Sequence, residues 1–135
     1  MQLAFIKTES NFRPTARTQR KYVFGLIPSG RISSAYGYSQ ALDGTWKEYK
    51  KSTGNRYHRR SNFMHSTNFI GWYVDKTNRT LGIAKNNAYL QYLAYHQGQA
   101  GFKTGAYKTK KGLLEVARKT ANNKKIFDRQ LKKCL

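Results

Sequence analysis

Acidic residues are the first candidates for chemistry, because the chain carries only 6 Asp and Glu against 26 Lys and Arg. Glu9 follows the apolar run Leu3–Ile6 and precedes Ser10. A carboxyl group beside apolar side chains resists ionisation, so its pKa rises, and a general acid at neutral pH needs that property. Glu9 is therefore a candidate general acid. The alternative is purely structural, since many helices end in a Glu.

The other five acids have ordinary interpretations. Asp43 is expected to cap a helix, Asp75 lies beside Lys76 at a helix end, and the rest lie on charged helix faces: Glu48, Glu115 and Asp128.

The sequence gives little indication of a metal site or of a catalytic nucleophile. The three histidines, His58, His65 and His96, match no metal-binding spacing, and the motifs H-E-x-x-H, G-x-S-x-G and the P-loop are missing from the sequence. A single cysteine, Cys134, allows neither an internal disulfide nor a cysteine-based zinc site. We therefore expect no metal and no other cofactor.

The first half of the chain has to position Glu9. Pro14 ends a short helix near Ser10, because proline cannot continue a helix. Arg17 to Ser34 lacks a helical period and contains several Gly, Pro and Ser residues, which predicts a loop or a small hairpin. The spacing of Leu42, Trp46 and Tyr49 then predicts a helix that Asp43 caps and Gly54 ends, followed by a basic loop at 56–60.

Four further apolar clusters predict helices: Phe69–Val74, Tyr89–Ala94 after a cap at Asn86 or Asn87, Leu113–Ala117, and Ile126–Leu131. We expect Gly98, Gly101 and Gly105 to break the second of these. The chain is thus predicted to be mainly α, with five to six helices and little strand.

The net charge of +20 is concentrated in the two flanks of the sequence. Residues 1–60 carry 12 Lys and Arg against 3 acids, residues 61–102 carry 3 against 1, and residues 103–135 carry 11 against 2. The middle segment is nearly neutral and rich in aromatic residues, as one wall of a cleft would be. The flanks indicate a polyanion or an anionic surface as partner, although a merely solvated surface is the alternative.

Four short motifs follow one another along residues 9–98. Glu9–Phe12 is similar to the Glu-Ser-x-Phe element of soluble lytic transglycosylases and goose-type lysozymes. Tyr36–Gln40 with Gly44–Trp46 is similar to their Gly-Leu-Met-Gln and Pro-x-Thr-Trp elements. Asn68–Tyr73 resembles their Asn-Ile-x-x-Gly-x-x-Tyr-Leu helix, and Tyr92–Gly98 resembles their Ala-Tyr-Asn-Ala-Gly element. Together these motifs resemble that family, and imply an α+β lysozyme-like fold with a substrate cleft.

The chain departs from the family pattern in three places. Polar residues replace Leu and Met just before Gln40, which makes that part of the cleft wall more polar. His96 and Gln97 replace Asn and Ala, which alters how an N-acetyl sugar is held. The stretch from Glu9 to Gln40 is longer than usual, so Arg17–Ser34 is expected to be an insertion.

The resemblance implies cleavage of the β-1,4 bond between N-acetylmuramic acid and N-acetylglucosamine in peptidoglycan. Most glycosidases use two carboxylates roughly 5–10 Å apart. Lytic transglycosylases use one glutamate, here Glu9, which protonates the leaving oxygen and then accepts the proton of the muramyl 6-hydroxyl, so that a 1,6-anhydro ring closes. No acid lies between Glu9 and Gln40, where goose-type lysozymes place supporting carboxylates. The sequence therefore favours the non-hydrolytic reaction.

The resemblance also implies a set of substrate-binding residues. Gln40 is expected to line the cleft and hydrogen-bond sugar, and Ser10 to position the backbone of Glu9 or touch the substrate. Tyr95 is expected to hold Glu9 through its hydroxyl or to face the scissile bond, with His96 and Gln97 as further cleft candidates. The structural alternatives are a core aromatic for Tyr95 and a helix-cap residue for Gln40.

Two other functions stay open. A hydrolytic muramidase would cleave the same bond with Asp43, or with a water held by polar side chains. A basic nucleic-acid-binding module would use the charge and interleaved Tyr residues, although no recognised nucleic-acid motif occurs.

The length of 135 residues predicts one lysozyme-like domain over 1–135. No apolar run reaches the ~20 residues of a membrane span, and no secretory signal is recognisable. With the short first helix, this predicts a domain excised from a longer chain. We expect a monomer that acts on peptidoglycan glycan strands in the periplasm or cell envelope, or that is delivered there as an effector or as a phage or secretion-system component.

Overall fold

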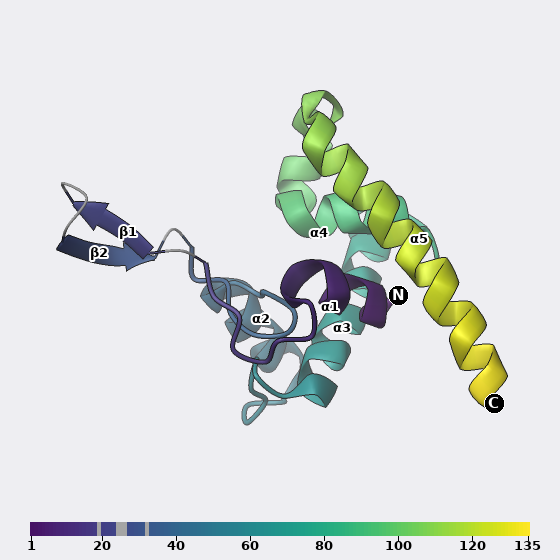
Figure 1. The fold of residues 1–135 in the computed structure, drawn as a ribbon, viewed down its shortest axis with the longest axis horizontal. Coiled ribbons are helices and arrows are strands. Elements are labelled where there is room, and N and C mark those ends of the chain that lie inside the picture. The colour runs from purple at the N-terminus through teal and green to yellow at the C-terminus, as the bar shows by residue number, and fades with distance from the viewer. Residues whose placement is uncertain (19, 24–26, 32) are drawn as a thin grey trace. The chain divides into compact units, whose positions relative to one another are not determined.

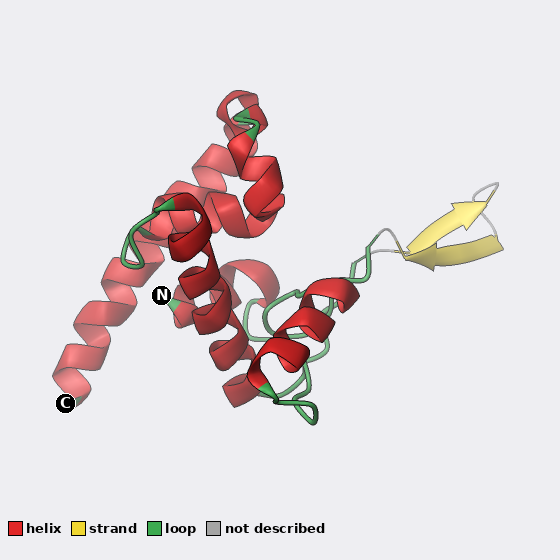
Figure 2. Ribbon diagram, turned by 180° about the vertical axis from the view of Figure 1, so that it is seen from behind, coloured by secondary structure: helices red, strands yellow, loops and turns green. Residues whose placement is uncertain are grey.

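The computed structural model describes residues 1–18, 20–23, 27–31 and 33–135. In this part of the chain, five α-helices, one 3₁₀ helix and one two-stranded antiparallel sheet are present (Figures 1 and 2). The predicted mainly α class is confirmed. The elements in chain order are α1 (Gln2–Ser10), β1 (Arg20–Val23), β2 (Ile27–Arg31), α2 (Asp43–Thr53), α3 (Phe63–Leu81), α4 (Ala88–Lys103), η1 (Ala106–Thr109) and α5 (Lys111–Cys134).

The chain folds into two compact units. One consists of Met1–Thr8 with Ile70–Leu135, and we call it the terminal unit; the other is Glu9–Phe69, the internal unit. Helices α1 and α3 each contribute residues to both units. The expectation of one lysozyme-like domain stays a prediction.

Aromatic and aliphatic side chains form the core of the terminal unit. Phe5 and Leu93 are fully buried, and the ring of Phe5 makes an edge contact with Tyr92 at 5.4 Å between centroids. Helix α5 packs against α4 and η1. The Thr8 and Thr120 hydroxyl oxygens are 2.7 Å apart, which joins α1 to the buried face of α5.

Three aromatic residues form the core of the internal unit. Trp46 and Tyr49 on α2 are buried together with Phe69 on α3. Their ring centroids lie 5.1 to 5.4 Å apart. The i, i+3 spacing of Trp46 and Tyr49 places both on the inner face of α2, as predicted.

The segment expected to be a loop or small hairpin contains β1 and β2. The register pairs Arg20 with Arg31 and Val23 with Ile27, with an irregularity in the pairing next to Arg20. Phe24 and Gly25, which fall within the predicted segment, lie outside the described residues. The hairpin alternative is confirmed.

Two of the predicted helix boundaries are confirmed by their caps. Asn87 caps α4, since its side chain accepts a hydrogen bond from the Leu90 amide at 3.1 Å. Gly54 ends α2 in the left-handed conformation, at φ 73°. The prediction for Asp43 was wrong. Leu42 is the cap residue of α2, and the Asp43 carboxylate in the first turn pairs with Arg60 instead.

Helix α5 is continuous where two helices were predicted. Asn122 and Asn123 weaken the helical pattern between the clusters Leu113–Ala117 and Ile126–Leu131, but the helix runs through them. Helix α4 likewise continues beyond Gly98, which introduces a kink at φ 75° rather than an end. No helix in the described chain is long and apolar enough to cross a membrane.

Candidate active site

Glu9 lies in the last turn of α1, where the helix enters the internal unit. It is half-buried, whereas the next residue, Ser10, is 2% exposed. The Ser10 hydroxyl donates a hydrogen bond to the Tyr38 carbonyl oxygen at 2.8 Å. Asn11 and Phe12 then adopt positive φ angles, and this left-handed pair turns the chain away from the helix. Ser10 thus attaches the end of α1 that carries Glu9 to the loop before α2.

Gln40 belongs to the same turn as Tyr38, whose carbonyl oxygen accepts the hydrogen bond from Ser10. Its side-chain nitrogen donates to the carbonyl oxygens of Ala16 at 2.8 Å and Gly37 at 2.9 Å. Because both amide protons are used within the fold, the polar atom that Gln40 can offer a ligand is its carbonyl oxygen, which accepts a hydrogen bond from a hydroxyl. The backbone of Gln40 is left-handed, at φ 53°. Gln40 is a turn residue, and not the helix cap of the alternative interpretation.

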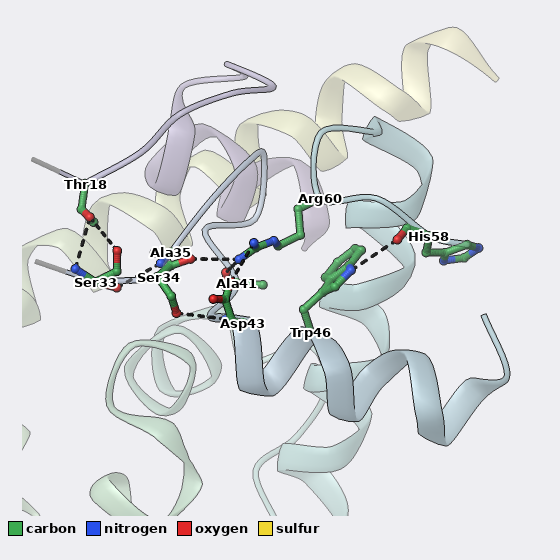
Figure 3. A network of polar contacts seen from close by, with 9 residues as sticks. All are labelled: Thr18, Ser33, Ser34, Ala35, Ala41, Asp43, Trp46, His58 and Arg60. Carbon is green, nitrogen blue, oxygen red and sulfur yellow. Dashed lines mark hydrogen bonds and ion pairs between the residues drawn. The ribbon is translucent and has the colours of Figure 1, made fainter. Parts of the chain in front are cut away.

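Arg60 holds the same loop from the other side (Figure 3). One guanidinium nitrogen donates to the carbonyl oxygens of Ser34 and Ala41, each at 2.9 Å. The other pairs with the Asp43 carboxylate at 2.8 Å, while the Arg60 side chain is 19% exposed. Arg60 therefore fixes both ends of the segment 34–43 that contains Gln40.

The backbone of Arg60 also contacts the turn. Its carbonyl oxygen accepts hydrogen bonds from the Tyr38 amide at 3.2 Å and the Ser66 hydroxyl at 3.1 Å. Gly37 fits against this carbonyl only because it lacks a side chain, as a Cβ there would lie 2.1 Å from the oxygen.

The loop that bears Arg60 is attached to α2 through His58. The Trp46 ring nitrogen donates to the His58 carbonyl oxygen at 3.4 Å (Figure 3), and the Tyr49 hydroxyl lies 2.7 Å from the His58 Nδ1 atom. His58 also stacks on His65, with ring centroids 3.9 Å apart. Burial, and then the charge of His65, lower the pKa of His58. Burial raises the pKa of Tyr49.

Tyr95 is part of the terminal unit. Its half-buried ring makes edge contacts with Phe5 and Tyr73, both at 5.0 Å between centroids. These contacts agree with the core-aromatic alternative for its ring, while the expected roles of its hydroxyl stay predictions.

His96 and Gln97 lie next to Tyr95 and just before the kink at Gly98. The Gln97 side-chain nitrogen is 3.4 Å from His96 Nδ1, and the Lys110 ammonium donates to the Gln97 side-chain oxygen at 3.3 Å. His96 is exposed. Desolvation by its neighbours, and then the charge of Lys110, lower the pKa of His96, which favours the neutral ring at neutral pH.

The six predicted site residues are thus divided between the two units. Glu9, Ser10 and Gln40 belong to the internal unit, where Ser10 and Gln40 bond to the same turn. Tyr95, His96 and Gln97 are neighbours on α4 of the terminal unit. Their roles toward a substrate stay predictions. Within the described chain, no group of three or more His, Cys, Asp or Glu residues could hold a metal ion.

The roles of Arg60 and Gly37 were not predicted from the sequence. Arg60 was part of a basic stretch expected to be a plain loop, and its partners lie 17 to 26 residues earlier in the chain, so no local pattern reveals them. Gly37 belongs to one of the four motifs, and a glycine between two tyrosines is consistent with a close backbone approach that only glycine allows.

The family model of the transglycosylase SLT domain matches residues 1–134. The chain belongs to this family. The resemblance seen in the four motifs is confirmed, and membership implies a transglycosylase that cleaves glycosidic bonds in peptidoglycan. No curated protein and no solved structure matches the chain significantly.

Proposed function

We propose that this SLT domain is a lytic transglycosylase that cleaves the bond between N-acetylmuramic acid and N-acetylglucosamine with Glu9 as its one acid and base. The observation that carries the proposal is the family match over residues 1–134, which includes the Glu-Ser-x-Phe motif at Glu9. The site of action we propose is the bacterial cell envelope, where this substrate occurs.

The reaction proceeds in two proton transfers. Glu9, protonated, donates its proton to the glycosidic oxygen as the bond from that oxygen to the muramyl C1 breaks. The resulting Glu9 carboxylate accepts the proton of the muramyl 6-hydroxyl, whose oxygen bonds to C1. The proton count on Glu9 is restored, and the product ends in a 1,6-anhydro ring.

The ion pair of Asp43 supports the one-carboxylate mechanism over hydrolysis. Asp43 is the acid that a hydrolytic mechanism would recruit, but its carboxylate is held by Arg60 at 2.8 Å. The Asp43 carboxylate oxygen that pairs with the guanidinium is thereby occupied and is not free to orient a water. In the described terminal unit, Asp75, Glu115 and Asp128 each pair with a Lys or Arg.

Ser10 and Gln40 are proposed to position the reacting groups. Ser10 holds the last turn of α1 through the Tyr38 carbonyl, and a shift of that turn would move Glu9 relative to the glycosidic oxygen. The side-chain oxygen of Gln40 is proposed to accept a hydrogen bond from a sugar hydroxyl.

Replacing Glu9 by Gln tests the proposal, because the amide is isosteric and cannot transfer the proton. Glu9→Gln should abolish release of soluble fragments from purified peptidoglycan while the far-ultraviolet circular dichroism and melting temperature stay those of the parent. Undiminished release by Glu9→Gln would refute the role of Glu9. Products with reducing ends in place of anhydro ends would favour the hydrolytic muramidase.

A further inference from the structure

One face of α5 carries a straight row of positive charge. Lys111, Arg118, Lys125, Arg129 and Lys133 follow one another at steps of seven and four residues, and all five are exposed. Such steps are close to whole helical turns, so the five side chains lie along one side of the helix over about 33 Å. We call these five residues the basic stripe.

The opposite face of α5 is the one that packs within the terminal unit. Ala117 and Thr120 are fully buried, and the Thr120 hydroxyl contacts that of Thr8 at 2.7 Å. Thr120 lies about half a turn from the stripe around the helix, and Ala117 about a third of a turn. The stripe is therefore exposed along a helix whose other side packs within the terminal unit.

The acids of α5 leave the stripe uncompensated. Glu115 pairs with Lys119 at 3.2 Å and Asp128 pairs with Lys124 at 2.5 Å, and neither of these cations belongs to the stripe. No side chain of the stripe forms an ion pair with any carboxylate of the described chain. Helix α5 has eight Lys and Arg residues against two acids, so this surface attracts anions.

We propose that the basic stripe binds the carboxylate groups of the stem peptides along a peptidoglycan strand, and so retains the enzyme on its polymeric substrate. The identity of this partner rests on the proposed function. A linear polymer that presents carboxylates at intervals is complementary in charge and shape to a straight row of cations, and Arg forms bidentate bonds with carboxylates.

Two other polyanionic partners fit the stripe less well. Of the exposed apolar residues of α5, Val116 and Leu131 lie within about 40° of the buried Thr120, on the packed side of the helix, and only Ile126 borders the stripe. The stripe therefore has no apolar face beside it on which the helix could lie in a membrane surface. The stripe contains no aromatic side chain on which a nucleobase could stack.

Sedimentation with purified peptidoglycan, stripped of covalently attached polymers, tests the proposal. All proteins carry Glu9→Gln, so that binding is measured without cleavage. The stripe variant is Arg118→Gln/Lys125→Gln/Lys133→Gln. The matched control is Arg59→Gln/Lys47→Gln/Lys51→Gln, which removes the same charge from exposed positions outside α5. We expect the affinity of the stripe variant to fall about tenfold and that of the control to fall less than about twofold.

A second arm identifies the anion. Coupling the stem-peptide carboxylates to a neutral amine should weaken binding of the parent and abolish its advantage over the stripe variant. Circular dichroism and melting temperature establish that each variant is folded; if Lys133→Gln impairs folding, Arg129→Gln takes its place in the triple variant.

Four outcomes would overturn the proposal. Two concern unmodified peptidoglycan: equal losses of affinity in the stripe variant and the control, or unchanged affinity of the stripe variant. The third is an advantage of the parent that persists on amidated peptidoglycan. The fourth is a loss of affinity in the stripe variant for duplex DNA or anionic phospholipid vesicles but not for peptidoglycan. The binding result is independent of cleavage. If the catalytic proposal failed because Glu9→Gln still released fragments, the stripe would be tested by the same comparison on unmodified peptidoglycan in the cold, with binding scored before fragments are released.

Discussion

Gly37 occupies a position in the Gln40 turn where a side chain has no room. Its φ angle is 82°, and a Cβ would lie 2.1 Å from the carbonyl oxygen of Arg60. Both the backbone conformation and the close approach thus require glycine. The turn that carries Gln40, and that receives the hydrogen bond of Ser10, depends on this contact.

Replacing Gly37 by Ala should therefore lower the free energy of unfolding by about 2–3 kcal/mol, from backbone strain and the displaced loop. Urea denaturation measures the change. Gly44→Ala is the matched control, because Gly44 lies in α2 with open space around it, and Ala there should be neutral or stabilising by up to about 1 kcal/mol. Equal stability of the two variants would contradict the role of Gly37.

Arg60 acts through geometry that lysine cannot reproduce. Arg60→Lys keeps the charge near Asp43 but cannot donate to the Ser34 and Ala41 carbonyls and Asp43 at once. We expect a loss of about 1–3 kcal/mol in unfolding free energy and about tenfold in the rate of fragment release, because the Gln40 turn shifts. Arg59→Lys, at the exposed neighbouring position, should change neither quantity.

The loop between α2 and α3 makes the internal unit sensitive to pH. Because the pKa of His58 is lowered on folding, the unfolded chain binds more protons than the folded one. The free energy of unfolding should therefore fall as the pH drops below about 6.5, the ordinary pKa of histidine, and this contribution should level off below the folded pKa. Urea denaturation at several pH values should show a weaker decline for His58→Gln. An identical decline in that variant would contradict the assignment.

Local signals made some elements predictable. Gly54 ends α2 through its left-handed backbone, and Asn87 begins α4 through a hydrogen bond from the Leu90 amide, so short sequence patterns reveal both. The prediction placed two helices in α5 because its apolar residues form two clusters, Leu113–Ala117 and Ile126–Leu131. The stretch between them contains the weak helix formers Asn122 and Asn123. The burial of Thr120 and its contact with Thr8, 112 residues away, favour the continuous helix. A contact between residues so far apart in the chain cannot be predicted from a local sequence pattern.

For the whole molecule, the net charge of +20 predicts opposite effects of salt on stability and on activity. Salt screens the repulsion among the cations, so the melting temperature should rise modestly. It also screens attraction to the anionic wall, so fragment release from intact walls should fall steeply between about 0.05 and 0.5 M salt. Release that is independent of salt would contradict an electrostatic contribution to wall binding.

Only those residues of the candidate site that belong to short sequence motifs were predictable. Glu9, Ser10 and Gln40 were found because each belongs to a short motif, and the structure attaches Ser10 and Gln40 to one turn. The dependence of that turn on Arg60 could not be found, since it arises from contacts across 17 to 26 residues of chain. Tyr95 was noted with a structural alternative, and its ring indeed packs against Phe5 and Tyr73.

Mass spectrometry of the fragments released from purified peptidoglycan tests the central claim most directly. The parent protein should release fragments that end in 1,6-anhydro-N-acetylmuramic acid, each lighter by one water than the hydrolytic product, and Glu9→Gln should release none. Fragments with reducing ends, or anhydro fragments still released by a folded Glu9→Gln variant, would contradict a one-carboxylate transglycosylase centred on Glu9.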